Sequence, residues 1–361
     1  MKGAMHDNAK FREEVDSWEE VRTESFYPCR APDIFGLSSS DDHLKKYFLR
    51  KISSDDVKVP AQDLYYINDG FVSDLTFVFD RYEKMTTLSA RDHVNLLELE
   101  QIKNISNSEV QGFDSTCAFI FKAGKNNYGH FLLEMLPRIE NILKSNEHCR
   151  FLIVPSLPPA IRIILDAVID LLYRDRFELI HMSMPLLQAK RLIVPGPVTK
   201  HNDQKSQVVS EFADKILLAY GCSRELKERK LIYVSRSNEK NRQMTNEKIL
   251  EYYLEEIGFE IVYPQNLKFE DQVRLFSTAS HVVGPIGAAL SNIIFCPKGA
   301  KVAMISPGMF DFFFYDIACL RNLDFTWLFT SSLKWPSLAD LHGSWKIDVD
   351  SVKKNVEKFL E

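Results

Sequence analysis

The chain of 361 residues lacks several features that define specialised classes of protein. It has no Cys-x-x-Cys pair and no paired histidine spacing, so a zinc site has little support and we expect no metal. It has no surplus of positive charge, because a net charge of −5 argues against wholesale nucleic-acid binding. It has no run near the roughly 20 apolar residues that span a bilayer. These absences leave a soluble globular protein as the expectation.

An apolar leader is also missing from the first 18 residues, which are charged and polar. The six cysteines are scattered, at Cys29, Cys117, Cys149, Cys222, Cys296 and Cys319. An even number permits disulfides, but this scatter is more typical of small buried thiols in a reducing compartment. We therefore expect a cytoplasmic protein, and leave open a peripheral contact at the inner face of the membrane.

What the chain does contain is an ordinary globular composition and a regular alternation of patterns. Hydrophobic residues make up 45% and charged residues 26%, which is enough for a large core. In the first half, strand patterns at 117–121, 151–154 and 192–195 alternate with helical patterns at 128–144, 159–173 and 207–220. In the second half, strands at 231–234, 259–263, 281–283, 301–305 and 325–329 alternate with helices at 246–257, 269–279 and 310–320.

This alternation predicts an α/β architecture, with parallel sheets covered by helices on both faces. The length favours two domains over one large α/β domain. We expect an N-terminal extension at 1–60, Rossmann-like domains at 61–205 and 206–340 that face a cleft, and a C-terminal helix at 341–361 that packs back across them. Residues 63–80 are predicted to form strands joined by a turn at Asn68-Asp69-Gly70.

A glycine-rich turn follows the predicted strand at the centre of the second half. Gly284 and Gly287 are small, and Ala288 and Ala289 continue toward a short helix that contains Asn292. Small residues let a ligand approach the backbone, and the first helical N–H groups favour an anion. The turn lacks the Gly-x-Gly-x-x-Gly of dinucleotide sites and the Lys-Ser/Thr of a P-loop. It is a candidate site for a phosphate or diphosphate, and the alternative is a turn that serves packing alone.

Two arginines could supply the compensating charge. Ser235 and Arg236 directly follow the strand at 231–234, and Arg242 comes six residues after Arg236. Ligands of parallel sheets bind beyond the carboxyl ends of the strands, so we expect these residues at the same edge as the glycine-rich turn. Guanidinium groups bind phosphate oxygens with paired hydrogen bonds. The alternative is a loop of solvated charges.

A third group of polar residues recurs along the helix predicted at 128–144. His130, Glu134 and Arg138 are spaced every four residues and share one stripe, and Asn127 precedes the helix. A histidine and a carboxylate one turn apart are typical of a general base and its orienting partner. The alternative is a polar stripe with an ordinary Glu134–Arg138 ion pair.

These three segments together resemble glycosyltransferase family 61, the DUF563 group, over about residues 115–306. The Asn-x-x-His-x-x-x-Glu/Asp helix of the family is matched by Asn127, His130 and Glu134. Its Ser-Arg followed by a second arginine is matched by Ser235, Arg236 and Arg242. Its Gln-bearing helix and Gly-x-His-Gly-Ala-x-x-x-Asn turn are matched by Gln272, Gly284, Gly287, Ala288 and Asn292, with Ile286 in place of the histidine.

The resemblance implies a GT-B fold, a nucleotide-sugar donor on the C-terminal domain, no obligatory metal or other cofactor, and inversion at the anomeric carbon. The residues expected at the donor are Ser235, Arg236, Arg242, Gly284 and Gly287–Ala289, with Glu270, Gln272 and Asn292 bordering the nucleoside. Glu134 is the first choice for the base with His130 as its partner, or the reverse, and Asn127 and Arg138 lie on the acceptor side.

We therefore expect an inverting glycosyltransferase that uses a nucleotide sugar, UDP-sugar first, and a glycan acceptor in capsule, lipopolysaccharide or exopolysaccharide assembly. Isoleucine cannot donate a hydrogen bond to phosphate or ribose, so Ile286 raises an alternative. That alternative is a nucleotide- or sugar-binding protein of the same fold with weak or no turnover. A dinucleotide-dependent oxidoreductase is disfavoured because the Gly-x-Gly-x-x-Gly turn is missing.

Two pairs of aspartates have alternatives of their own. Asp166 and Asp170 are four apart on one helix, a spacing that fits a solvated amphipathic face better than a catalytic pair. Asp348 and Asp350 resemble the metal-binding Asp-x-Asp of many glycosyltransferases. Their place just before a predicted helix favours Asp350 as a helix cap instead.

Overall fold

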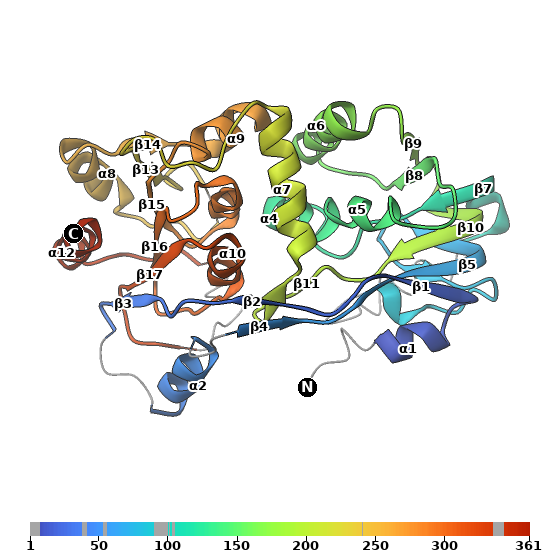
Figure 1. The fold of residues 1–361 in the computed structure, drawn as a ribbon, viewed down its shortest axis with the longest axis horizontal. Helices are drawn as coiled ribbons and strands as arrows, with labels where there is room; N and C mark the ends of the chain where they lie inside the picture. Colours follow the sequence, from blue (N-terminus) through green and yellow to red (C-terminus); the bar gives the residue numbers. More distant parts are fainter. Residues whose placement is uncertain are drawn as a thin grey trace. The chain divides into compact units, whose positions relative to one another are not determined.

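The computed structural model describes residues 8–37, 42–52, 56–89, 100, 102, 105–239, 241–334 and 343–361, which form two compact units (Figure 1). The first unit comprises residues up to Ser25, Val59–Lys200 and Ser206–Phe212. The second comprises Phe26–Lys58, His201–Lys205 and Ala213–Glu361. This division differs from the predicted one, because residues assigned to a separate extension before residue 61 contribute to both units.

The first unit is built on a mixed sheet of seven strands. Their order is β1 (Ser17–Arg22), β5 (Gln62–Ser73), β10 (Leu186–Pro195), β7 (Val110–Ala118), β8 (Phe151–Val154) and β9 (Glu178–His181), with β6 (Val78–Phe79) also on β5. The strands from β10 to β9 pair in parallel, as the alternating pattern predicts. The contacts of β5 with β1, β6 and β10 are antiparallel.

The predicted turn at Asn68-Asp69-Gly70 is wrong, because β5 continues through these residues as one strand of 12 residues. β10 pairs with it along its length, from Leu186 opposite Ser73 to Pro195 opposite Leu64. Asp69 adopts a positive φ of 52°, which turn-forming residues tolerate, without breaking that register. The long partner strand therefore overrides the local turn preference.

The helices of the first unit include two stretches of wider π-helix. The segments are α1 (Asn8–Glu13), α4 (Tyr128–His130), η3 (Phe131–Met135), α5 (Arg138–Ile142), α6 (Pro159–Val168) and η4 (Ile169–Tyr173), with short 3₁₀ turns η1 (Thr87–Ser89) and η2 (Asn107–Glu109). The single helix predicted over 128–144 is thus three segments. It widens where the N–H of Leu136 donates to the carbonyl of Phe131, just before Pro137, which has no N–H to donate.

The solvated-face interpretation of Asp166 and Asp170 is confirmed. Both carboxylates form exposed i,i+4 ion pairs, Asp166 with Arg162 and Asp170 with Arg174. Exposed pairs of this kind contribute only about 0.3–0.5 kcal/mol each. They therefore mark the outer face of this helix and provide no catalytic pair.

The second unit contains a sheet of six strands in which every pair is parallel. The order is β14 (Glu260–Val262), β13 (Leu231–Val234), β15 (His281–Pro285), β16 (Lys301–Ser306), β17 (Asp324–Phe329) and β3 (Asp33–Phe35). Its helices are α2 (Asp42–Ile52), α8 (Glu247–Glu256), η5 (Pro264–Asn266), α9 (Phe269–Phe276), η6 (Ala288–Phe295), α10 (Phe313–Arg321) and α12 (Val349–Leu360). Between the two sheets in sequence lie β11 (Thr199–Lys200), β12 (Gln204–Lys205) and α7 (Gln207–Ala219).

The C-terminal helix α12 packs within the second unit, against α8 and β17. Its buried residues Val352, Val356 and Phe359 join the core that also contains Tyr233. The cap of this helix is Asp348, whose carboxylate accepts the N–H of Ser351, so the prediction that Asp350 is the cap is wrong by two residues. Asp350 lies in the first turn, where a negative charge suits the helix dipole.

Residues 26–58 are an integral part of the second unit. β3 extends its sheet by pairing with β17, and β2 (Ser25–Pro28) pairs with β4 (Asp56–Val59). Phe48 of α2 is fully buried, and its ring centroid lies 4.9 Å from that of Trp327. Burying an aromatic side chain of this size contributes about 1.5–3 kcal/mol, which explains why this polar stretch is folded.

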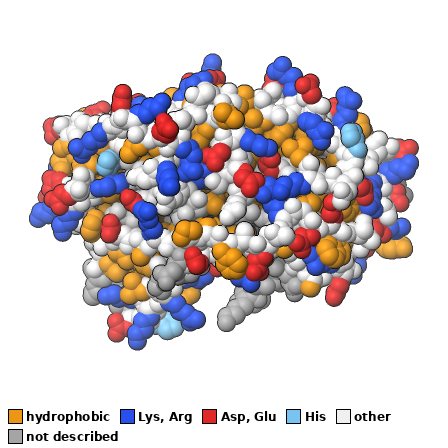
Figure 2. All heavy atoms as spheres, in the orientation of Figure 1, with side chains coloured by type: hydrophobic (Ala, Val, Ile, Leu, Met, Phe, Trp, Pro, Cys, Tyr) orange, Lys and Arg blue, Asp and Glu red, His pale blue; other side chains and the backbone are white. Residues whose placement is uncertain are grey.

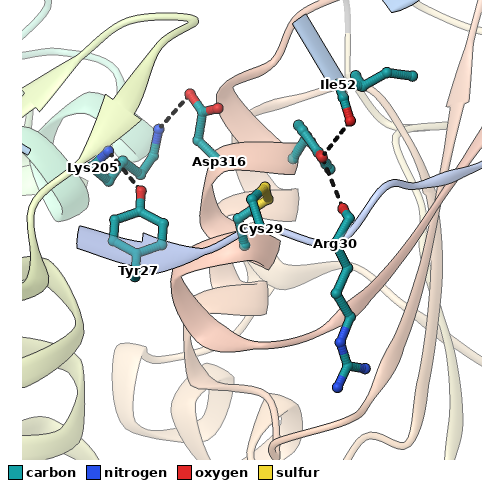
Figure 3. The surroundings of a disulfide bond; sticks show 8 residues. Tyr27, Cys29, Arg30, Ile52, Lys205 and Asp316 are labelled. Carbon is teal, nitrogen blue, oxygen red and sulfur yellow. Dashed lines mark hydrogen bonds and ion pairs between the residues drawn. A yellow bond between two sulfur atoms is a disulfide. The ribbon is translucent and has the colours of Figure 1, made fainter. Parts of the chain in front are cut away.

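A disulfide joins Cys29, just after β2, to Cys319 on α10 (Figure 3). The expectation of buried free thiols is therefore wrong for this pair, although Cys117, Cys149, Cys222 and Cys296 are free. The partners are 290 residues apart, so no local spacing could indicate the bond. The disulfide ties residues 26–58 covalently to the rest of the second unit.

Next to the disulfide lies a buried pair of opposite charges (Figure 3). The ammonium of Lys205 lies 3.7 Å from Asp316 Oδ2 and 3.9 Å from the ring centroid of Phe313. Burial raises the pKa of Asp316 to about 7, although the positive charge of Lys205 opposes the rise. The hydroxyl of Tyr27 accepts the backbone N–H of Lys205 at 3.2 Å, so β2 and β12 are both anchored beside α10.

The surface agrees with the small net charge. On the face drawn in Figure 2, acidic and basic side chains are intermingled. Among the described residues, no helix is both long enough and apolar enough to cross a bilayer.

Candidate functional site

The candidate site of the second unit lies where two neighbouring parallel strands end. β13 and β15 are adjacent, with Leu231 opposite His281 and Tyr233 opposite Val283. Both chains leave the sheet at the same edge, so the residues that follow β13 meet those that follow β15. The topology therefore brings Arg236 to the glycine-rich turn, as the sequence predicts.

Arg236 packs directly on Gly287. A Cβ atom added to Gly287 would lie 1.9 Å from Nη1 and 2.7 Å from Cζ of Arg236. The φ of Gly287 is 174°, an extended conformation open to any residue, so backbone strain does not require the glycine. The glycine leaves room for the guanidinium group in this position, and any side chain at 287 would displace it. Gly284 has a different role, since a Cβ there would meet Cβ of Val234 at 3.0 Å on the neighbouring strand.

The guanidinium of Arg236 is buried and only partly hydrogen-bonded. Its Nη2 donates to the carbonyl of Asn241 at 2.8 Å, whereas its buried Nε has no hydrogen-bond partner among the described residues. Burial lowers the pKa of Arg236, and the positive charge of Arg242 lowers it further. The negative charges of Glu239 and Glu247 act in the opposite direction and raise that pKa.

The backbone of Arg242 has an uncommon conformation and is held by a hydrogen bond from Trp345. It adopts a positive φ of 53°, which is uncommon outside glycine, and its carbonyl accepts the indole N–H of Trp345 at 3.1 Å. Backbone conformations of this kind tend to gather at functional sites. The side chain of Arg242 is half-buried, so solvent and ligands can reach it.

The remaining predicted donor residues divide into three groups. Ala288 and Ala289 are half-buried and open the 3₁₀-helix η6, where an ordinary short helix was predicted. Asn292 and Gln272 are buried and joined by a hydrogen bond of 2.9 Å, so their amides hold the turn against α9. Glu270 forms an exposed ion pair with Arg274 on α9.

Ile286 lies between the two glycines and faces the core. It is 1% exposed, and its N–H donates to the carbonyl of Ile305 on β16. The side chain at this position therefore contributes to packing and offers no hydrogen bond to a ligand.

The candidate site of the first unit is centred on the start of α4. The side chain of Asn127 accepts the N–H groups of Gly129 at 2.9 Å and of His130 at 3.3 Å, so Asn127 is the helix cap. Gly124 has a φ of 87°, and a Cβ there would lie 3.3 Å from Cδ2 of His130. The imidazole is thus fixed by a capped helix on one side and a glycine turn on the other.

Glu134 lies one turn further along and contacts two basic groups. Its Oε2 lies 3.0 Å from Nδ1 of His130 and 2.7 Å from Nζ of Lys122. Glu134 is 2% exposed, and burial alone would raise its pKa. The close contact with Nδ1 of His130 and the positive charge of Lys122 outweigh burial and hold that pKa well below its usual range. Glu134 is therefore an ionised carboxylate with little tendency to take up a proton.

The alternative that the sequence left open, an ordinary Glu134–Arg138 ion pair, gives way to a different arrangement. Arg138 is fully buried, and its Nε donates to the backbone carbonyl of Glu134 at 2.8 Å. Burial lowers the pKa of Arg138 to about 10. Lys122 forms the ion pair with Glu134, although no sequence motif includes Lys122. Its position between a predicted strand and the helix is a weak signal, because other cations, Arg138 among them, lie closer to Glu134 in sequence.

Comparison with known proteins supports the resemblance. Residues 128–303 match the family model described as glycosyltransferase 61, a range that includes His130, Glu134, Arg236, Arg242 and Gly287. No curated protein matches the chain. Among solved structures, it is similar to the bacterial iron-containing dodecameric glycosyltransferase TibC from enterotoxigenic E. coli. The identity is 11%, the match covers 77% of this chain and 80% of that one, and the TM-score is 0.28.

The protein is a glycosyltransferase. The family match supports glycosyltransferase family 61 for residues 128–303, which include His130, Glu134 and Arg236.

Proposed function

We propose that this enzyme transfers a sugar from a nucleotide sugar to a glycan acceptor with inversion at the anomeric carbon. The observation that carries the proposal is the position of the Arg236 guanidinium against Gly287, beside Arg242. This arrangement gathers two positive charges and a turn of small residues at one sheet edge. A nucleoside diphosphate is the leaving group that such a site suits best.

In this proposal the diphosphate completes the hydrogen bonding of Arg236. A buried donor without a partner costs about 1–3 kcal/mol, and more for a charged group. A phosphate oxygen at Nε would remove that cost and add a charge-assisted bond of roughly 1.5–3 kcal/mol. The backbone N–H groups of Gly287–Ala289 would contribute further donors. Ile286 adds none, so recognition would depend on the arginines and the backbone.

We further propose that His130 is the general base and Glu134 its orienting partner. The family resemblance favours the opposite order, with Glu134 as the base. The low pKa of Glu134 supports the change, because an ionised carboxylate paired with Lys122 is a weak base. With Nδ1 against Glu134, His130 would accept the proton of the acceptor hydroxyl at Nε2 as that hydroxyl attacks the anomeric carbon. The bond to the nucleoside diphosphate breaks in the same step.

We also propose a GT-B fold, a UDP-sugar donor, independence of a metal or other cofactor, and a place in capsule, lipopolysaccharide or exopolysaccharide assembly. The Cys29–Cys319 disulfide argues against the expected cytoplasmic location, because disulfides persist mainly in oxidising compartments.

A thermal-shift screen against nucleotide sugars tests the proposed function. A ligand that binds only the folded state raises stability by about 2.7 kcal/mol at 100 times its Kd. We expect at least one nucleotide sugar to raise Tm, and the same compound to release free nucleoside diphosphate faster with a glycan acceptor present. A screen of UDP-, GDP-, ADP- and dTDP-sugars in which none shifts Tm or releases its nucleoside diphosphate would contradict the proposal.

A further inference from the structure

The backbone of Arg236 is held by a buried carboxylate from another element. Oε1 of Glu247, the first residue of α8, accepts the N–H of Arg236 at 2.9 Å and the hydroxyl of Tyr233 at 2.9 Å. Glu247 is 1% exposed. Burial raises its pKa, while the two hydrogen bonds and the positive charge of Arg236 act in the opposite direction. One oxygen atom therefore links the end of β13 to the start of α8.

A second carboxylate, one helical turn away, holds the preceding residue. Oε1 of Glu251 accepts the hydroxyl of Ser235 at 2.6 Å, and its Oε2 lies 2.7 Å from Nζ of Lys248. Both oxygens of Glu251 thus have partners. Oε2 of Glu247, in contrast, has no hydrogen-bond partner among the described residues. The two carboxylates fix consecutive residues of the Ser235–Arg236 turn from the same side.

We propose that Glu247 is a positioning residue for the donor diphosphate. It does not need to touch the donor, because it acts through the backbone of Arg236. By fixing that backbone it sets where the guanidinium meets Gly287, and hence where phosphate oxygens are bound. The inference rests on the proposed function, since it assigns Glu247 to the diphosphate site.

Because Oε2 of Glu247 has no hydrogen-bond partner among the described residues, two substitutions can separate the effect of side-chain length from the effect of charge. Glutamine at position 247 retains an oxygen that can accept both bonds, and its amide nitrogen replaces an oxygen that has no partner. Aspartate retains the charge, but its carboxylate is one methylene shorter and falls short of Arg236. A positioning role therefore predicts that Glu247→Gln functions and Glu247→Asp fails, whereas a role for charge alone predicts the reverse.

The experiment is calorimetric titration of the full-length wild type and each variant with UDP, GDP, CDP and ADP. For the nucleotide that the wild type binds, we expect Glu247→Asp to raise Kd at least tenfold, about 1.4 kcal/mol, and Glu247→Gln to change it by less than about threefold. Glu255→Gln, an exposed carboxylate on the same helix, is the matched control and should bind as the wild type does. The fitted stoichiometry separates a change in Kd from a loss of folded protein.

The possible outcomes distinguish a failure of the positioning role of Glu247 from a failure of the proposed function. If Arg236→Ala loses nucleotide binding while Glu247→Asp retains wild-type Kd, the positioning role is wrong and the donor site stands. Weak binding by Glu247→Gln with strong binding by Glu247→Asp also overturns the positioning role. If no nucleoside diphosphate binds the wild type, the proposed function fails and takes the inference with it. In steady-state kinetics, positioning predicts that Glu247→Asp raises KM for the donor and leaves KM for the acceptor unchanged.

Discussion

At the scale of single residues, the contact between Arg236 and Gly287 is the most informative feature of this protein. The guanidinium occupies the space that any side chain at position 287 would need. The glycine is therefore explained by a neighbour 51 positions earlier in the chain, and not by its own backbone conformation. Because of this contact, a substitution at Gly287 can test the position of Arg236 without altering Arg236 itself.

Replacing Gly287 with alanine should displace Arg236 and weaken donor binding. The new Cβ would overlap the far end of a flexible side chain, so the guanidinium can move while the fold survives. We expect Kd for the donor nucleotide to rise at least tenfold, about 1.4 kcal/mol, with Tm nearly unchanged. Gly112→Ala is the control, because a Cβ there meets nothing within 4 Å. Wild-type affinity in Gly287→Ala would show that the contact has no part in binding.

How far residue roles follow from sequence depends on the range of the contacts involved. Arg236 and Gly287 could be paired in advance because each follows a strand, and neighbouring parallel strands end at one edge. Lys122 could not be chosen as the partner of Glu134, because several cations lie nearby in sequence, Arg138 among them. The hydrogen bond that Asn292 donates to Gln272 could likewise not be predicted from the spacing of the two residues in sequence.

At the scale of elements, the parallel α/β pattern was predictable and the details at element ends were not. Strand β13 matches its predicted bounds, and β15 extends its prediction by two residues, because apolar runs define buried strands. The π-helical segment η3 and the 3₁₀-helix η6 follow from hydrogen-bond choices that the 3.6-residue period does not encode. β3 was missed because a strand of three residues carries almost no pattern.

The disulfide links residues 26–58 to α10 covalently, in addition to the hydrogen-bonded pairing of β3 with β17. Replacing both Cys29 and Cys319 with serine removes a cross-link that closes a very long loop, so the free energy of unfolding should fall by about 2–4 kcal/mol. The measurement is Tm by calorimetry, with Cys222→Ser, a half-buried free cysteine, as the control. Alkylation of Cys29 and Cys319 in the native, unreduced protein would show that the bond does not form.

At the scale of the whole molecule, the two units are expected to perform separable tasks. The second unit carries the candidate diphosphate site, and the first carries His130, Glu134 and Lys122. The sequence indicated two α/β halves. It could not show that residues 26–58 fold with the second half, because that result depends on contacts such as Phe48 with Trp327 across nearly the full chain.

Because the two units are expected to perform different tasks, substitutions in the first unit should affect kcat and not donor affinity. His130→Asn should lower kcat for transfer by about 10²–10⁴-fold, the range of general base catalysis, and leave donor Kd unchanged. Glu134→Gln should also lower kcat, because the imidazole of His130 loses the carboxylate that orients it. His148→Asn alters an exposed histidine of the same unit and serves as the control. A large loss of donor affinity in His130→Asn would contradict this division.

The central claim is that Arg236 binds the diphosphate of the donor, and calorimetry of Arg236→Ala tests it most directly. Arg274→Ala, which removes an exposed arginine paired with Glu270, is the matched control. We predict that Arg236→Ala raises Kd for the donor nucleotide at least tenfold, about 1.4 kcal/mol, while Arg274→Ala retains wild-type affinity. An unchanged Kd in a folded Arg236→Ala protein would contradict the account.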